Sequence, residues 1–228
     1  MPPEPSKKTP GEPALNAWHT RLHTLAAGTV ADHPVPAATA HLVDEAGSRW
    51  PGTLPFFAWR RRQTAAEPPT PETLVTPGSP DQTIWSIVAT DQRLDAPTLD
   101  LTTPATGPRP LFDQGTAKTI EVWTEQELSA LHALRWLLAR ETADAARTAL
   151  RARMHSAIRW HLAATQPDNA TNRPWALHVF AEFAVTEHEI EADLYAQTLL
   201  HNCMQAKAQP DTLSAHILQD AADALANL

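Results

Sequence analysis

Residues 124–140 have the sequence TEQELSALHALRWLLAR, and this stretch decides the fold of the second half of the chain. Its leucines recur every three or four residues, the spacing that places side chains on one face of an α-helix. They are Leu128, Leu131, Leu134 and Leu138. Thr124 precedes Glu127 by three residues, which is the capping-box arrangement, so we expect this helix to begin at Thr124.

The residues behind this stretch continue the helical pattern. All seven glycines and most prolines precede residue 124, so few residues that interrupt helices remain after it. Thr186 and Glu189 form a second capping box, and Asp211 is suited to cap a last helix. Four further helices are expected, over residues 142–165, 175–185, 186–206 and 211–228. Residues 124–228 are therefore predicted to be a helical domain, an antiparallel bundle of helical hairpins.

The first 123 residues differ because they are rich in proline and glycine. We expect a disordered tail over residues 1–13 and an irregular, loop-rich α+β part over residues 14–123. Apolar spacing and β-branched residues locate the elements of that part. We expect helices over 14–27 and 37–46, and strands over 83–90 and 118–123 that pair in a small antiparallel sheet. The whole protein is thus expected to be mainly α.

An aromatic run from Trp50 to Trp59 precedes Arg60, Arg61 and Arg62. Aromatic rings beside arginines can stack nucleic-acid bases. The formal net charge of −8 argues against that function, because nucleic-acid binders present a basic surface to the phosphates. We therefore expect an aromatic core cluster followed by a solvated arginine stretch, and no nucleic-acid partner.

Other features of the composition restrict the class of protein. No stretch approaches the ~18 apolar residues that span a bilayer, so no membrane association is expected. The N-terminal sequence MPPEPSKKTPGEP lacks the apolar core of a signal peptide, which predicts a cytoplasmic, soluble protein. Cys203 is the single cysteine, which excludes an intrachain disulfide. Arginine far outnumbers lysine, which we interpret as GC-rich coding and a bacterial source.

The connection from His161 to Trp175, HLAATQPDNATNRPW, is the main candidate site. It places many donors and acceptors between two prolines, and Trp160 and Trp175 would supply apolar walls on either side. The alternative is that these residues only form a turn, since Asn, Asp and Pro are common in turns. The candidate ligand-binding residues are His161, Asp168, Asn169, Arg173, Trp175, His178 and Glu182.

Two of these residues, His178 and Glu182, are one helical turn apart on the polar strip of an otherwise apolar helix. A buried His–Glu pair could transfer protons or bind a metal. The alternative is that the two side chains only satisfy each other, and the pattern favours this structural role.

A basic stripe is expected on the helix over 142–165. It consists of Arg147, Arg151, His155 and Arg159, each four residues from the next. Like charges at that spacing repel one another, so the stripe needs a partner. We expect the neighbouring acidic residues Glu187, Glu191 and Asp193, or solvent, to provide it; the alternative is a ligand that carries phosphate.

Metal and cofactor motifs are weak or missing in the sequence. His19 and His23 are one helical turn apart, but no third ligand accompanies them, so no metal site is assigned. His188, Glu189, Glu191 and His201 form a second loose set on one helix. The chain lacks a phosphate loop, a GxSxG motif, a CxxC pair and a dinucleotide fingerprint, so no cofactor is predicted.

Residues 145–184 consist of a helix, the turn Gln166-Pro167-Asp168-Asn169, and Trp175 at the start of the next helix. This pattern resembles the helical hairpins of α/α-toroid proteins related to terpenoid cyclases and prenyltransferases. The chain departs from it because no glycine follows the aspartate and the hairpin does not recur. The resemblance implies helical hairpins around a central cavity and no catalytic residue.

We expect the protein to be a non-enzymatic module that binds a ligand or another protein, because no strong catalytic motif is present. Its expected partner is a small molecule, a second copy of the chain bound through the helical bundle, or another protein. One alternative is a small-molecule enzyme with a polar site around residues 161–182. The other is a metal-binding helical protein.

Overall fold

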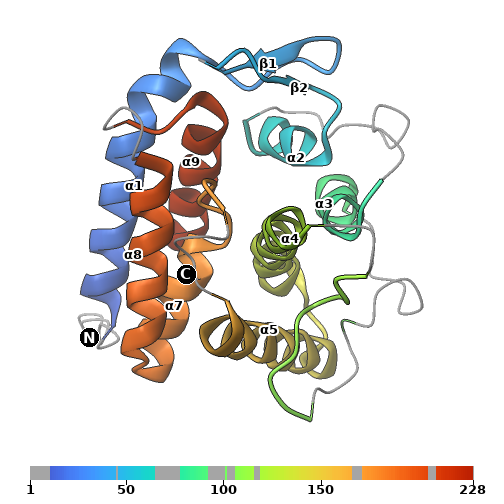
Figure 1. Ribbon diagram of the computed structural model, residues 1–228, viewed down its shortest axis with the longest axis vertical. Helices are drawn as coiled ribbons and strands as arrows, with labels where there is room; N and C mark the ends of the chain where they lie inside the picture. Colours follow the sequence, from blue (N-terminus) through green and yellow to red (C-terminus); the bar gives the residue numbers. More distant parts are fainter. Residues whose placement is uncertain are drawn as a thin grey trace, which may run out of the picture.

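The computed structural model describes residues 11–44, 46–64, 78–91, 101, 106–115, 119–165, 171–204 and 209–227. Within these ranges the chain forms eight α-helices and one two-stranded sheet, so the prediction of a mainly α protein is confirmed (Figure 1). The elements are α1 (Glu12–Asp32), β1 (His41–Val43), β2 (Arg49–Pro51), α2 (Pro55–Thr64), α3 (Pro80–Thr90), α4 (Ile120–Arg140), α5 (Asp144–Ala164), α7 (Leu177–Glu187), α8 (Ile190–Met204) and α9 (Thr212–Ala226).

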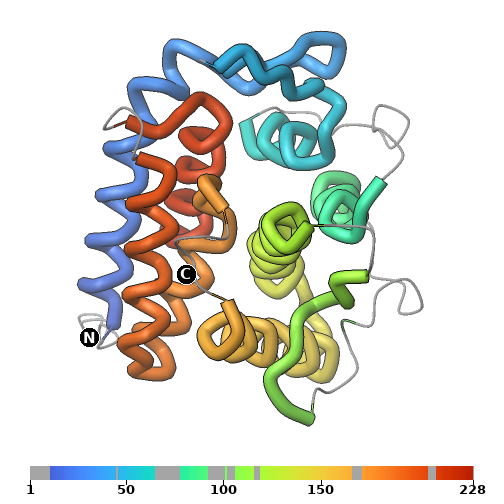
Figure 2. The backbone as a smooth tube through the Cα atoms, in the orientation of Figure 1, coloured from blue at the N-terminus to red at the C-terminus, as the bar shows by residue number. Residues whose placement is uncertain are grey.

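The helices form two groups that share one core. Helices α1, α7, α8 and α9 lie on one side of the molecule, and α2 to α5 lie on the other, seen nearly end-on in Figure 1. The helices nearest the two ends of the described chain, α1 and α9, pack side by side (Figure 2). Buried apolar side chains form one cluster that extends from Trp18 in α1 to Leu225 in α9. The described helices include none with the length and apolar character needed to cross a membrane.

Residues 83–90, predicted as a strand, belong to helix α3. Their buried side chains, Ile84, Trp85, Val88 and Ala89, recur at the spacing of a helix. Pro80 occupies the first turn after Ser79, a position where its missing N–H costs nothing. The strand prediction is wrong because a β-branched composition is a weak preference that tertiary packing overrides.

The first turn of α4 replaces the second predicted strand, over 118–123. The helix begins at Ile120 after Thr119, and Thr124 is buried inside it, so the capping box predicted at Thr124 is also wrong. The buried indole of Trp123 packs edge-on against Trp160 at 5.2 Å between ring centroids, and this contact favours helix before Thr124. The predicted division at residue 124 therefore falls within a helix.

The second capping box, at Thr186, is absent too. Thr186 lies within α7 and donates its hydroxyl to the carbonyl of Glu182. By contrast, Asp211 caps α9 as predicted, since its carboxylate accepts the N–H of Ser214 at 3.0 Å.

The small antiparallel sheet exists but is built from residues other than those predicted. Strand β1 lies inside the range 37–46 that was predicted as a helix. It pairs with β2, and Leu42 stands opposite Trp50. Asp44 accepts the backbone N–H groups of Ala46 and Ser48, and Gly47 adopts a φ of 85°. A side-chain turn of this kind competes with helix formation and closes the hairpin.

Because α1 packs on α9, we predict that the second half of the chain does not fold independently of the first. A fragment that begins at Thr119 lacks α1, α2 and α3 and exposes the buried faces of α4 and α9. We expect it to show no cooperative thermal transition, whereas the chain from residue 11 onward should unfold in one step. Circular dichroism at 222 nm measures both; a sharp transition in the fragment would contradict a shared core.

Candidate functional site

A buried carboxylate, Asp220 of α9, collects four hydrogen-bond donors from two other helices. Trp59 Nε1 and Arg60 of α2 each donate to it at 3.1 Å. His132 Nε2 and Trp136 Nε1 of α4 donate at 2.9 and 2.8 Å. These five residues, which we call the Asp220 cluster, join α2, α4 and α9 in the centre of the protein. Burial opposes ionisation of Asp220, but the hydrogen bond from His132 and the charge of Arg60 outweigh it and lower its pKa.

The Asp220 cluster corrects the prediction that Arg60 begins a solvated stretch. The Arg60 side chain is almost fully buried and also binds Asp223 at 2.6 Å. A signal was present in the sequence, because Asp220 follows Ile217 by three residues and so lies on the apolar face of its helix. A charged residue at such a position requires a buried partner.

The imidazole of His132 connects this cluster to the residues before α7. Its Nδ1 accepts the backbone N–H of Ala176 at 3.3 Å, which assigns the ring proton to Nε2, the atom that donates to Asp220. Ala176 has a φ of 57°, a left-handed conformation that costs a residue with a Cβ about 1–2 kcal/mol. This conformation turns the chain so that Trp175 points toward α2 and α3, where it packs on Phe56 and Trp85.

His178 and Glu182 do not form the pair considered from the sequence. The carboxylate of Glu182 binds Arg135 Nε at 2.5 Å and lines a separate hollow of about 260 Å³ with His155 and Glu187. The ring of His178 packs against His132 at 4.2 Å, and neither of its nitrogens has a hydrogen-bond partner among the described residues. Burial, together with electrostatic interactions with His132 and Arg135, lowers the pKa of His178 well below its usual value.

His161 lies apart from both of these residues. Its Nδ1 is 3.2 Å from the hydroxyl of Thr165, and its Nε2 is 3.9 Å from a carboxylate oxygen of Glu127. Complete burial lowers the pKa of His161 to about 3. Burial raises the pKa of Glu127 to about 8, although its carboxylate accepts the N–H groups of Leu111 and Phe112. Both shifts favour the neutral forms of His161 and Glu127, although the charge of nearby Arg153 acts against the shift of Glu127.

Arg173 serves the connection between the hairpin and α9. Its guanidinium binds the capping residue Asp211, lies 3.8 Å from Asp44, and sits over the ring of Trp50 at 5.4 Å. Asp168 and Asn169 lie outside the described residues, as does the Gln166–Asn169 turn. The described candidates His161, Arg173, His178 and Glu182 thus occupy different environments, and only Trp175 lines the pocket described next.

A cavity of about 210 Å³, which we call the aromatic pocket, lies between β2, α2, α3, α4 and Trp175. Three of its rings contact one another: Phe56 is 5.1 Å from Trp85 and 5.0 Å from Trp175 between centroids. Trp50 supplies a fourth ring. Polar groups from α3 and α4 complete the lining, namely Asp81, Gln82, Glu125, Gln126 and Ser129.

The two carboxylates of the aromatic pocket, Asp81 and Glu125, are only partly exposed. Burial raises the pKa of both, and the charge of Asp81 further raises that of Glu125. Ser129 accepts the indole N–H of Trp85 at 3.0 Å, and both Ser129 and Ser79 hydrogen-bond Asp81. The sequence did not point to these acids, because Asp81 fell in the loop-rich part outside every predicted element and Glu125 fell inside a predicted capping box.

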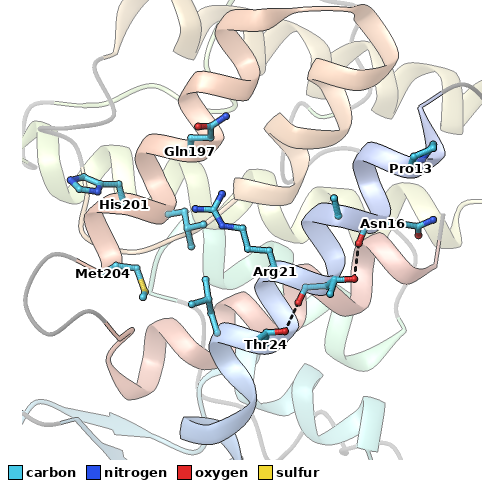
Figure 3. Close-up of a pocket in the computed structure, with 11 residues that line it drawn as sticks. Pro13, Asn16, Arg21, Thr24, Gln197, His201 and Met204 are labelled. Atoms are coloured by element: carbon cyan, nitrogen blue, oxygen red, sulfur yellow. Dashed lines mark hydrogen bonds between the residues drawn. The ribbon is translucent and has the colours of Figure 1, made fainter.

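A larger groove of about 1050 Å³ runs between α1 and α8 (Figure 3). Its polar side chains are mostly exposed, and the hydroxyls of Thr20 and Thr24 are already bonded to backbone carbonyls of their own helix. Arg21 reaches into the groove from α1 in this view. The groove holds few polar groups in fixed positions, so the smaller aromatic pocket is the better candidate for selective binding.

The basic stripe meets an acidic partner in part. Arg159 lies 3.4 Å and His155 3.9 Å from Glu187, as expected, whereas Asp193 binds Trp18 and Gln197 instead. His19 contacts the carbonyl of Ala222, and its ring centroid is 6.1 Å from that of His23. The described part of the chain contains no group of three metal-ligating side chains close enough to hold an ion.

No family model, curated protein or solved structure matches this chain. The resemblance to α/α-toroid hairpins stays a prediction.

The Asp220 cluster predicts a large and specific loss of stability. Asp220→Asn removes the negative charge that compensates buried Arg60, and breaking a buried ion pair costs about 3–5 kcal/mol. Asp223→Asn is the matched control, because Asp223 is 35% exposed and should cost under about 1 kcal/mol. Urea unfolding followed by fluorescence measures the free energy of unfolding of both variants. Equal losses would mean that burial gives the Arg60–Asp220 pair no larger effect than the Arg60–Asp223 pair.

The unpartnered ring of His178 predicts a pH-dependent difference between wild type and His178→Leu. The native ring stays neutral while the unfolded ring protonates below its usual pKa of 6.5, so wild type loses stability as pH falls. Below pH 6.5 the free energy of unfolding of the leucine variant should rise relative to that of wild type by about 1.4 kcal/mol per pH unit, until the buried ring protonates. Denaturant unfolding at pH 7 and pH 5 measures the change, and a constant difference would contradict it.

Proposed function

We propose that the protein is a non-enzymatic small-molecule binding module and that the aromatic pocket is its binding site. The observation that carries this proposal is the presence of two partly buried carboxylates in a cavity that four aromatic rings also line. Burying a carboxylate without a full partner costs stability, and an apolar side chain would fill the space at lower cost. Perturbed carboxyl groups in a cavity are a common property of functional sites.

The construction of the aromatic pocket also supports binding. Its walls come from five segments that are far apart in the sequence, so a bound molecule would contact residues 50–56, α3, α4, Trp175 and Leu213 of α9 at once. A ligand that binds only the folded arrangement of these segments stabilises it by mass action.

A binding role is favoured over catalysis by the side chains that line the aromatic pocket. None of its described lining residues is a histidine, cysteine, lysine or arginine, and Ser129 already bonds Trp85 and Asp81. Binding of a second copy or of another protein stays a separate prediction, for which we claim no surface.

A blocking variant tests this function. Val122 lines the mouth of the aromatic pocket and is 49% exposed, so Val122→Trp should obstruct it without disturbing the core. Ile120→Trp is the matched control, since Ile120 is 50% exposed in the same helical turn and lies outside the pocket lining.

The measurement is a fragment screen by NMR, with the indole N–H signals of Trp85 and Trp175 as reporters. We expect fragments that shift these signals in wild type and in Ile120→Trp, and binding at least about tenfold weaker in Val122→Trp. Fragments that bind all three proteins equally, or no fragment that shifts either indole, would refute the site.

A further inference from the structure

The chemistry of the aromatic pocket defines a class of ligand more narrowly than its volume does. Two negative side chains, two glutamines and Ser129 provide its polar lining, and no described lining residue carries a positive charge. An anionic ligand would meet repulsion there that the charge of Arg173, outside the lining, offsets only in part. The pocket therefore selects for neutral or cationic molecules.

The two acids affect each other as well as a ligand. The charge of Asp81 opposes ionisation of Glu125, which burial already disfavours, and Arg173 offsets this only in part. That arginine also binds Asp211, and it lies over the ring of Trp50, a wall of the pocket. One cation in the pocket would relieve both carboxylates at once.

The walls favour a cation without strong hydrogen-bonding needs. Aromatic faces attract positive charge, and quaternary ammonium groups are recognised by cages of such rings. The protein contains one such contact already, the Arg173 guanidinium over Trp50. A primary ammonium would require three acceptors, and the acids of the pocket already accept hydrogen bonds, Asp81 from Ser79 and Ser129 and Glu125 from Trp175. The described residues contain no group of three metal-ligating side chains that could hold a metal ion.

The size of the aromatic pocket sets the length of the ligand. A volume of about 210 Å³ equals that of about seven water molecules in the liquid, well below the volume of pockets for drug-sized ligands. A methylated ammonium group with a short substituent fits this volume.

We propose that the aromatic pocket binds a small organic cation whose charged end is a methylated ammonium group, held between the aromatic rings and the carboxylates of Asp81 and Glu125. This inference rests on the proposed binding function of the same pocket.

The test compares choline with 3,3-dimethylbutan-1-ol, the uncharged isostere in which carbon replaces nitrogen. Titration calorimetry and the Trp85 and Trp175 indole signals are the readouts. We expect wild type to bind choline at least about tenfold more tightly than the isostere. This comparison needs no variant, so it does not depend on the folding of a mutant.

Charge-neutral variants then locate the preference. Glu125→Gln and Asp81→Asn should each lower the affinity for choline about tenfold and leave the isostere unaffected, while Glu121→Gln, an exposed carboxylate on the same helix, should change neither. If one pocket variant fails to fold, the other still decides.

The outcomes separate this inference from the function beneath it. Equal binding of choline and the isostere, or fragments that occupy the aromatic pocket while neither compound binds, would overturn the cation inference and leave the binding function intact. Absence of binding by choline, the isostere and every fragment would overturn both.

Discussion

The carboxylate of Asp220 is the constraint on which the arrangement of the helices depends. A buried charge is tolerated only when hydrogen bonds and opposite charge replace its water, and here Trp59, Arg60, His132 and Trp136 do so together. These donors lie on α2 and α4, so the hydrogen bonds to the two carboxylate oxygens of Asp220 fix the positions of both helices against α9. The register of α4 set in this way also presents Glu125 and Ser129 to the aromatic pocket, because they precede His132 and Trp136 on the same face of the helix.

The helices after residue 140 could be predicted because their apolar residues recur at a period that only a helix satisfies. The errors share a different cause. Residues 83–90 contain strand-forming side chains, yet Trp85 is held by Ser129 of α4 and by Phe56 of α2, contacts that local composition does not encode. The helix predicted over residues 37–46 is absent because the side chain of Asp44 organises a turn around Gly47. This interaction competes with helix formation over only a few residues.

The candidate site shows the same limit more sharply. Trp175 was singled out from the sequence and does line the aromatic pocket, but Asp81 and Glu125 were not, because the pocket unites segments separated by up to 163 residues, from Trp50 to Leu213. The His178–Glu182 spacing was read correctly as one helical turn. Neighbouring helices nevertheless offered each residue a closer contact: Arg135 for Glu182 and the ring of His132 for His178.

At the left-handed residue Ala176, one peptide unit belongs both to the wall of the aromatic pocket and to the surroundings of the Asp220 cluster. On one side is the indole of Trp175, a wall of the aromatic pocket; on the other is the N–H that selects the tautomer of His132. The rings of Trp175 and His132 are also in direct contact, at 5.6 Å between centroids. One wall of the aromatic pocket is therefore also a neighbour of the buried Asp220 cluster, so the pocket and the core that joins α2, α4 and α9 share a boundary one ring thick.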